Sequence, residues 1–143
     1  MEDYEVAFEA KRTKGGNNFA STMFPVGSEH VCLSVAGWDG RVVALHWVDG
    51  KPGVDNITTR RMDFENGRWY AVRVRVTKEK VQAWIDSDRM IDIARAGHKF
   101  TLDGPTAVLK PFGLSTAYST GVLRNIRLRR IEPGAAEAPK PGE

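Results

Sequence analysis

Residues 64–92 read FENGRWYAVRVRVTKEKVQAWIDSDRMID, and this stretch predicts a β-hairpin whose two faces differ in chemistry. Apolar side chains occupy every second position on both sides of the turn at 77–80, as expected for strands with one buried face. The residues expected to form the core are Tyr70, Val72, Val74, Val76, Val81, Ala83 and Ile85.

The other face of the hairpin carries side chains that can contact a ligand. They are Arg73, Arg75, Gln82 and Trp84. If Val76 pairs with Val81, antiparallel register places each of these arginines opposite the amide or the indole on the second strand. We therefore expect a ladder of Arg, Gln and Trp lying over an apolar sheet.

Similar short alternating segments recur along the chain, and no helical stripe persists for more than about two turns. The predicted strands are 4–12, 19–24, 30–36, 41–48, 57–62, 68–77, 81–85, 90–93, 112–116 and 121–131. Clusters of Gly, Asn and Asp separate them, which is typical of turns. The sequence thus predicts an all-β sandwich over residues 1–131, followed by a flexible Pro-, Gly- and Ala-rich tail over 132–143.

The composition agrees with a single domain. The 143 residues are 41% hydrophobic and 27% charged, which is ordinary for a folded globular protein. No apolar run is long enough to cross a bilayer, and strand-like sequence begins soon after Met1. We expect a periplasmic or extracellular protein if a signal peptide was removed, and a cytoplasmic one otherwise.

Charge argues only weakly for a macromolecular partner. The net charge of +3 is too small to favour nucleic acid, and no RNA-binding motif is present. Residues 123–131, however, contain four arginines and no acid, which suits either a solvated edge strand or an acidic protein partner. The single cysteine, Cys32, lies in an apolar run and is expected to be a buried free thiol.

Seven motifs occur in an order that resembles the DUF1080 family, also called the 3-keto-disaccharide hydrolase domain. They are FPVG (24–27), AGWDG (36–40), VDG (48–50) with DN (55–56), FENGRWY (64–70), AWID (83–86), PFGL (111–114) and LRNIRL (123–128). The resemblance covers nearly all of residues 4–131. It implies a bacterial protein with a concanavalin A-like jelly roll of two curved antiparallel sheets, and a carbohydrate ligand bound on the concave sheet or its rim.

The resemblance directs attention to aromatic and polar side chains that can bind a sugar. Sugar rings stack on Trp, while amides and charged groups bind the hydroxyls. The predicted ligand residues are the four on the hairpin face, Trp84, Arg73, Arg75 and Gln82, together with Trp38, His46, Asn56 and Arg60. A structural cation–π pair between Arg73 and Trp84 is the alternative for that part of the hairpin.

Catalysis has weaker support in the sequence. Most glycosidases need two carboxylates, and the glucanases of this fold are similar in a Glu-x-Asp-x-x-Glu strand that is absent here. Asp86 is the candidate catalytic acid, although Asp86 and Asp88 also suit a turn. Because the ketone of a 3-keto sugar acidifies a ring proton, one base and a Lewis acid could suffice for such a substrate.

No cofactor is expected, with calcium as the alternative. Asp49, Asp55 and Asn56 could surround a cation, although an ordinary surface loop is the favoured interpretation of this segment. The three histidines are scattered, which argues against zinc. The leading hypothesis is a non-catalytic carbohydrate-binding module. The alternatives are a hydrolase or lyase acting on 3-keto-glucosides, and a protein-interaction or assembly domain.

Overall fold

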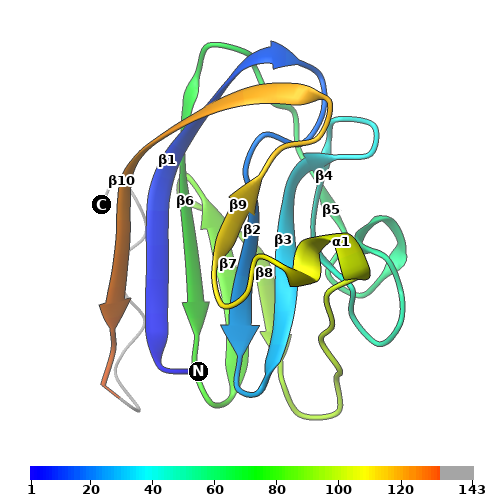
Figure 1. Ribbon diagram of the computed structural model, residues 1–143, viewed down its shortest axis with the longest axis vertical. Coiled ribbons are helices and arrows are strands. Elements are labelled where there is room, and N and C mark those ends of the chain that lie inside the picture. The colour runs from blue at the N-terminus through cyan, green and yellow to red at the C-terminus, as the bar shows by residue number, and fades with distance from the viewer. Residues whose placement is uncertain (133–143) are drawn as a thin grey trace.

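The computed structural model describes residues 1–132 and contains two five-stranded antiparallel sheets packed face to face (Figure 1). Sheet A has the order β10 (Ser119–Arg130), β1 (Tyr4–Gly15), β6 (Trp69–Val76), β7 (Lys80–Ile85) and β8 (Asp88–Ala94). Sheet B has the order β5 (Arg60–Arg61), β4 (Val42–His46), β3 (Glu29–Gly37), β2 (Ser21–Val26) and β9 (Gly113–Ser115). The predicted all-β sandwich is confirmed, while the predicted tail lies outside the described residues from residue 133 on.

The central hairpin has the predicted register. Val76 pairs with Val81, Arg75 with Gln82, and Arg73 with Trp84. The seven side chains expected in the core are all buried between the sheets. Strand β1 adds a second row of core residues beside β6, namely Tyr4, Val6, Phe8 and Ala10.

Several strands differ in length from the prediction, among them β5 and β1. The segment 57–62 forms only the two-residue strand β5, because a short 3₁₀ turn, η1 (Gly53–Asp55), and a loop occupy the preceding residues. Conversely, β1 continues to Gly15 and pairs with the long edge strand β10, with register shifts at two points. These bulges bend the pair along the edge of sheet A.

Sheet B alternates in the same way as sheet A. On β3 the side chains of Val31, Leu33 and Val35 point into the core, whereas Cys32 and Ser34 face outward. The outer face of β3 therefore carries small and polar side chains, which leaves room above this strand. Within residues 1–132, no helix is both long and apolar enough to span a membrane.

Candidate functional site

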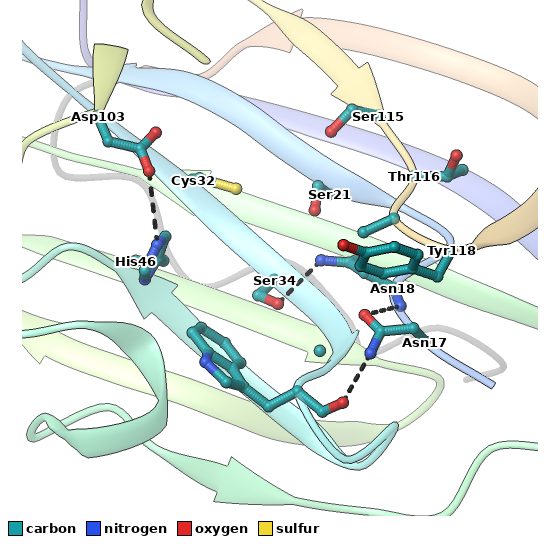
Figure 2. A pocket seen from close by; sticks show the side chains of 13 residues that line it. Asn17, Asn18, Ser21, Cys32, Ser34, His46, Asp103, Ser115, Thr116 and Tyr118 are labelled. Carbon is teal, nitrogen blue, oxygen red and sulfur yellow. Dashed lines mark hydrogen bonds and ion pairs between the residues drawn. The ribbon is translucent and has the colours of Figure 1, made fainter. Parts of the chain in front are cut away.

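A pocket of about 550 Å³ opens on the outer face of sheet B. Strands β2, β3 and β4 form its floor, and three segments form its walls: the β1–β2 loop, the β3–β4 turn and the β9–β10 turn. Asp103, which directly precedes the short helix α1 (Gly104–Ala107), lies at one end near His46 (Figure 2). The volume falls within the roughly 300–1,000 Å³ range of small-molecule sites.

The backbone at the end of β3 directs Trp38 into this pocket. Ala36 lies in a β-bulge at φ 68°, and Trp38 itself has φ 54° in the turn closed by the Gly40 N–H and the Gly37 carbonyl. A positive φ is unfavourable for a bulky side chain, and such strained residues are found in turns and at functional sites. The indole is 39% exposed, so the turn presents an aromatic surface to solvent.

The ring of Trp38 is held by its neighbours. The imidazole of His46 meets it edge to face, with centroids 5.1 Å apart and planes at 74°. Its far edge lies over Gly53, where an added Cβ would come within 2.9 Å of Trp38 Cη2. The indole is thus packed on one side and open on the other, an arrangement that limits the rotamer entropy lost on binding.

Amide and hydroxyl groups form the opposite wall and part of the floor. Asn17 donates from Nδ2 to the Trp38 carbonyl at 2.6 Å and accepts from the Asn18 N–H at 2.8 Å. Asn18 is buried, and its Nδ2 donates to Ser34 Oγ at 2.9 Å while its Oδ1 accepts from the Ala20 and Val35 N–H groups. These bonds attach the β1–β2 loop to the sheet (Figure 2).

His46 and Asp103 form the polar end of the pocket. His46 Nδ1 accepts a hydrogen bond from the Gly53 N–H at 2.9 Å, so its Nε2 carries the proton in the neutral ring. Burial lowers the pKa of His46, and the nearby Asp103 carboxylate opposes this shift. Nε2 lies 3.9 Å from Asp103 Oδ2, which is too far for a direct hydrogen bond.

The segment that carries Asp103 is attached to the end of β4. Val48 forms a bridge with Phe100, which is buried, and Trp47 and Thr101 exchange backbone hydrogen bonds. This segment comes from far along the chain, so the approach of Asp103 to His46 is a tertiary effect. Tyr118, 95% exposed at φ 49°, lies on the remaining side in the β9–β10 turn.

The structure brings together two of the eight predicted ligand residues, Trp38 and His46. The four hairpin residues lie on the outer face of sheet A, on the other side of the core from the pocket. They are buried there: Trp84 is 0% exposed and Arg73 is 6% exposed, and the Arg73 guanidinium lies 4.1 Å from the Trp84 ring centroid. The predicted cation–π pair is present, and a ligand role for these residues stays a prediction.

The other two predicted ligand residues lie outside the pocket. Asn56 organises the loop after β4: its Nδ2 donates to three carbonyls, and its Oδ1 accepts from the backbone and hydroxyl of Thr58. Arg60 is exposed on the edge strand β5. Asn56 therefore supports the wall near His46, whereas Arg60 contributes no lining atom.

The candidate acids are engaged in local structure. Asp86, at φ 54° in the β7–β8 turn, accepts from the Ala71 N–H at 2.9 Å and pairs with Arg68 at 3.0 Å. Asp49 accepts from the Lys99 N–H at 2.7 Å and contacts His98 Nδ1 at 2.7 Å, and these partners lower its pKa. Asp55 ends the turn η1. Among residues 1–132 no group of three or more His, Cys, Asp or Glu side chains could hold a metal ion.

The sequence did not single out four pocket residues, Asn17, Asn18, Ser34 and Asp103. The pair Asn17 and Asn18 follows two glycines and has the composition of an ordinary turn. Ser34 could be recognised as outward-facing from the alternation of β3, but an outward serine is common. The sequence around Asp103 contains nothing that indicates a position in a pocket.

Known structures share the fold. The carbohydrate-binding module CBM66 from Bacillus subtilis has a TM-score of 0.59 at 12% identity, over 90% of this chain and 75% of that one. Domain 4 of AbnA, an extracellular arabinanase of Geobacillus stearothermophilus solved with arabinotriose, gives 0.55 at 13% identity, over 90% of this chain and 61% of that one. A variant of human galectin-16 gives 0.52 at 11% identity, over 91% and 89%.

These similarities establish the jelly-roll β-sandwich fold of this chain. No protein-family model matches the sequence, and no curated protein matches it either. The resemblance to the DUF1080 family is therefore not confirmed and stays a prediction.

Proposed function

We propose that this protein is a carbohydrate-binding module that holds a short oligosaccharide in the pocket on the outer face of sheet B. The observation that carries the proposal is the position of Trp38, an exposed indole fixed in a strained turn beside hydrogen-bonding groups. A sugar ring presents a C–H face for stacking and hydroxyls at its rim, and the pocket offers a partner for each. Three structures with the same fold carry carbohydrate-related names, which supports the same ligand class.

Binding has more support than turnover. A hydrolytic pair requires two carboxylates roughly 5–10 Å apart, and among the described lining residues Asp103 is the one carboxylate. His46 has its Nδ1 lone pair engaged by Gly53 and a proton on Nε2, so the face it turns to the pocket is a donor rather than a base. Processing of 3-keto-glucosides remains the alternative proposal that the DUF1080 resemblance carries.

The test is a glycan array probed with the wild-type chain and two tryptophan variants. Trp38→Ala should remove binding, because it deletes the stacking surface. Trp69→Ala is the matched control: Trp69 is a partly exposed indole on sheet A, held between Lys11 and Arg124. We expect Trp69→Ala to bind as wild type does. The absence of binding to every glycan, or equal loss in both variants, would contradict the proposal.

The same array, probed in calcium and in a chelator, tests the calcium prediction. The loop holding Asp49, Asp55 and Asn56 adjoins the wall near His46, so a cation there would order one side of the pocket. Signals that disappear in the chelator would support a calcium site in this loop. Equal signals in both conditions would argue against it.

An acidic protein partner is the second proposal, and it rests on β10. Arg124 and Arg129 pair with Glu9 and Glu5, while Arg127 and Arg130 are exposed on the same edge strand. Exposed cations on an edge also prevent aggregation, so the observation has an ordinary explanation. Salt-sensitive binding of an acidic peptide that Arg127→Gln with Arg130→Gln removes would favour the partner.

A further inference from the structure

The pocket and the rest of the surface differ in charge. Among the described residues that line the pocket, Asp103 is the one that is charged at neutral pH, since His46 is held neutral by its contact with Gly53. No lysine or arginine belongs to this lining, although the chain contains 21 of them. Among the described lining residues, a ligand therefore meets the Asp103 carboxylate and no lysine or arginine.

This distribution is unfavourable for an anionic sugar. Proteins that bind carboxylate or sulfate groups use arginine forks or lysines, which satisfy the oxygens and neutralise the charge. Several arginines are engaged outside the pocket: Arg75 and Arg129 pair with Glu5, and Arg124 pairs with Glu9, all on sheet A. Arg12 lies behind the wall and donates to the Asn17 carbonyl at 3.0 Å. An anionic group beside Asp103 would be desolvated and would also be repelled.

The spacing at the polar end suits a hydroxyl. Two groups 3.9 Å apart can both reach one oxygen at about 2.8 Å, which is an ordinary hydrogen-bond length. A sugar hydroxyl can accept from His46 Nε2–H and donate to Asp103 Oδ2 at the same time. A carboxylate or sulfate oxygen can accept from His46 but has no proton to offer Asp103, so it leaves that contact repulsive.

We propose that the pocket selects glycans that are neutral or carry amino groups at this end, and rejects those carrying carboxylate or sulfate groups, with Asp103 setting the selectivity. The proposal rests on the proposed carbohydrate function and adds the ligand class to it. An ammonium group in place of the hydroxyl would donate to Asp103 but could not accept from His46 Nε2–H, so an amino sugar would gain a charge-assisted contact and lose one hydrogen bond.

The test uses sugars that differ only in charge. Calorimetry compares methyl-esterified oligogalacturonides with the free acids, and N-acetylated with deacetylated chito-oligosaccharides, alongside neutral gluco- and arabino-oligosaccharides. We expect each free acid to bind at least about tenfold more weakly than its neutral ester. The difference should shrink as salt is raised, because Asp103 is partly exposed and its field is screened.

Asp103→Asn should reduce the difference between acid and ester severalfold, because it keeps the shape and removes the charge. Asp88→Asn, which makes the same charge change on an exposed residue of sheet A, is the matched control and should leave the difference unchanged. Free acids that bind wild type as tightly as the esters, in a manner sensitive to Trp38→Ala, would overturn the selectivity and leave the carbohydrate function standing. If Asp103→Asn and Asp88→Asn change the difference between acid and ester equally, the selectivity is also overturned and the carbohydrate function stands. Failure of every sugar to bind would overturn both proposals.

Discussion

The guanidinium of Arg73 covers the indole of Trp84 at 4.1 Å on the outer face of sheet A, while the pocket opens on the outer face of sheet B. Trp84 and Trp38 thus have different environments. Trp84 is buried and lies against a cation, whereas Trp38 is partly open and lies against a neutral imidazole. This difference agrees with the proposed ligand role of Trp38 and with a packing role for Trp84.

Replacement of Trp84 should affect stability and leave sugar binding intact. Trp84→Ala is expected to lower the free energy of unfolding by about 3–5 kcal/mol, because it leaves a cavity under Arg73. Trp84→Phe should cost less, because the buried Nε1, which has no hydrogen-bond partner among the described residues, disappears with the indole. Urea unfolding of both variants checks the two stability losses. Calorimetry with a glycan on Trp84→Phe checks that sugar binding is intact. A folded Trp84→Phe variant with weakened glycan binding would indicate that Trp84 contributes to ligand binding.

The hairpin register followed from local pattern alone. Val76 and Val81 are separated by a four-residue turn, and any shift by one residue would move every valine from the core to the outer face. The position of Trp38 could also be anticipated in part, because it lies in a Gly-flanked turn without an obvious core position. The charge of the pocket could not be anticipated, since Asp103 reaches His46 through the long-range pairing of Val48 with Phe100 and of Trp47 with Thr101.

The outer face of sheet A shows a second property that sequence alternation does not predict, which is solvent exposure. The alternation of β6 and β7 correctly separates the core residues from Arg73, Arg75, Gln82 and Trp84, but it does not predict exposure. Long side chains on an outer face pack on one another, as Arg73 does on Trp84, and so become buried without entering the core. Alternation therefore predicts on which face of the sheet a residue lies, whereas the solvent exposure of its side chain depends on the tertiary structure.

The turn at Trp38 should reveal its strain through a pair of substitutions. Trp38→Asn and Trp38→Val both remove the indole, but Asn tolerates a positive φ and a β-branched residue does not. We expect Trp38→Val to be about 1–2 kcal/mol less stable than Trp38→Asn by chemical denaturation. Glycan binding should be lost equally in both. Equal stabilities would mean that the turn relaxes when the ring is removed.

Gly37 should be required for the floor of the pocket. A Cβ at this position would lie 2.4 Å from Ser34 Oγ, so Gly37→Ala must displace the hydroxyl that accepts from Asn18. The variant is expected to lose about 1–3 kcal/mol of stability. Gly16→Ala is the matched control, because nothing lies within 4 Å of its added Cβ.

Removing the hydroxyl should rescue the Gly37→Ala variant. In the double variant with Ser34→Ala the nearest remaining atom is Ser34 Cβ at 3.7 Å, an ordinary contact. A double-mutant cycle measured by thermal unfolding should therefore show a favourable coupling between the two substitutions. Additive losses would show that the clash with Ser34 is not the cause.

Cys32 should be chemically inert while the protein is folded. Burial raises the pKa of its thiol to about 12, so little thiolate is present at neutral or mildly alkaline pH. It borders the pocket floor but is nearly inaccessible. An aromatic disulfide reagent at pH 8 should modify it slowly, and denaturant should accelerate the reaction to the rate of a free thiol. Fast modification of the folded chain, blocked by a bound sugar, would indicate that the pocket floor opens.

His46 should titrate below the usual value for histidine. Burial lowers its pKa from 6.5, and the Asp103 carboxylate partly opposes the shift. The imidazole carbon chemical shifts of His46 in NMR spectra should therefore have a midpoint below 6.5, and Asp103→Asn should lower it further. A midpoint above 6.5 would mean that the Asp103 interaction outweighs burial, contrary to the expectation.

The same shift links stability to pH with a definite sign. Because the folded pKa is depressed, the unfolded chain binds a proton first as the pH falls through 6.5. As the pH falls from 6.5 to the pKa of His46 in the folded protein, the free energy of unfolding should decrease. Below that pKa, His46 should cause no further change in the free energy of unfolding. His30, whose pKa is also lowered, acts in the same direction, so the wild type must be compared with His46→Asn, in which Oδ1 can still accept from Gly53. The variant should show a shallower decrease between pH 7 and 5, and an unchanged slope would assign the effect to His30.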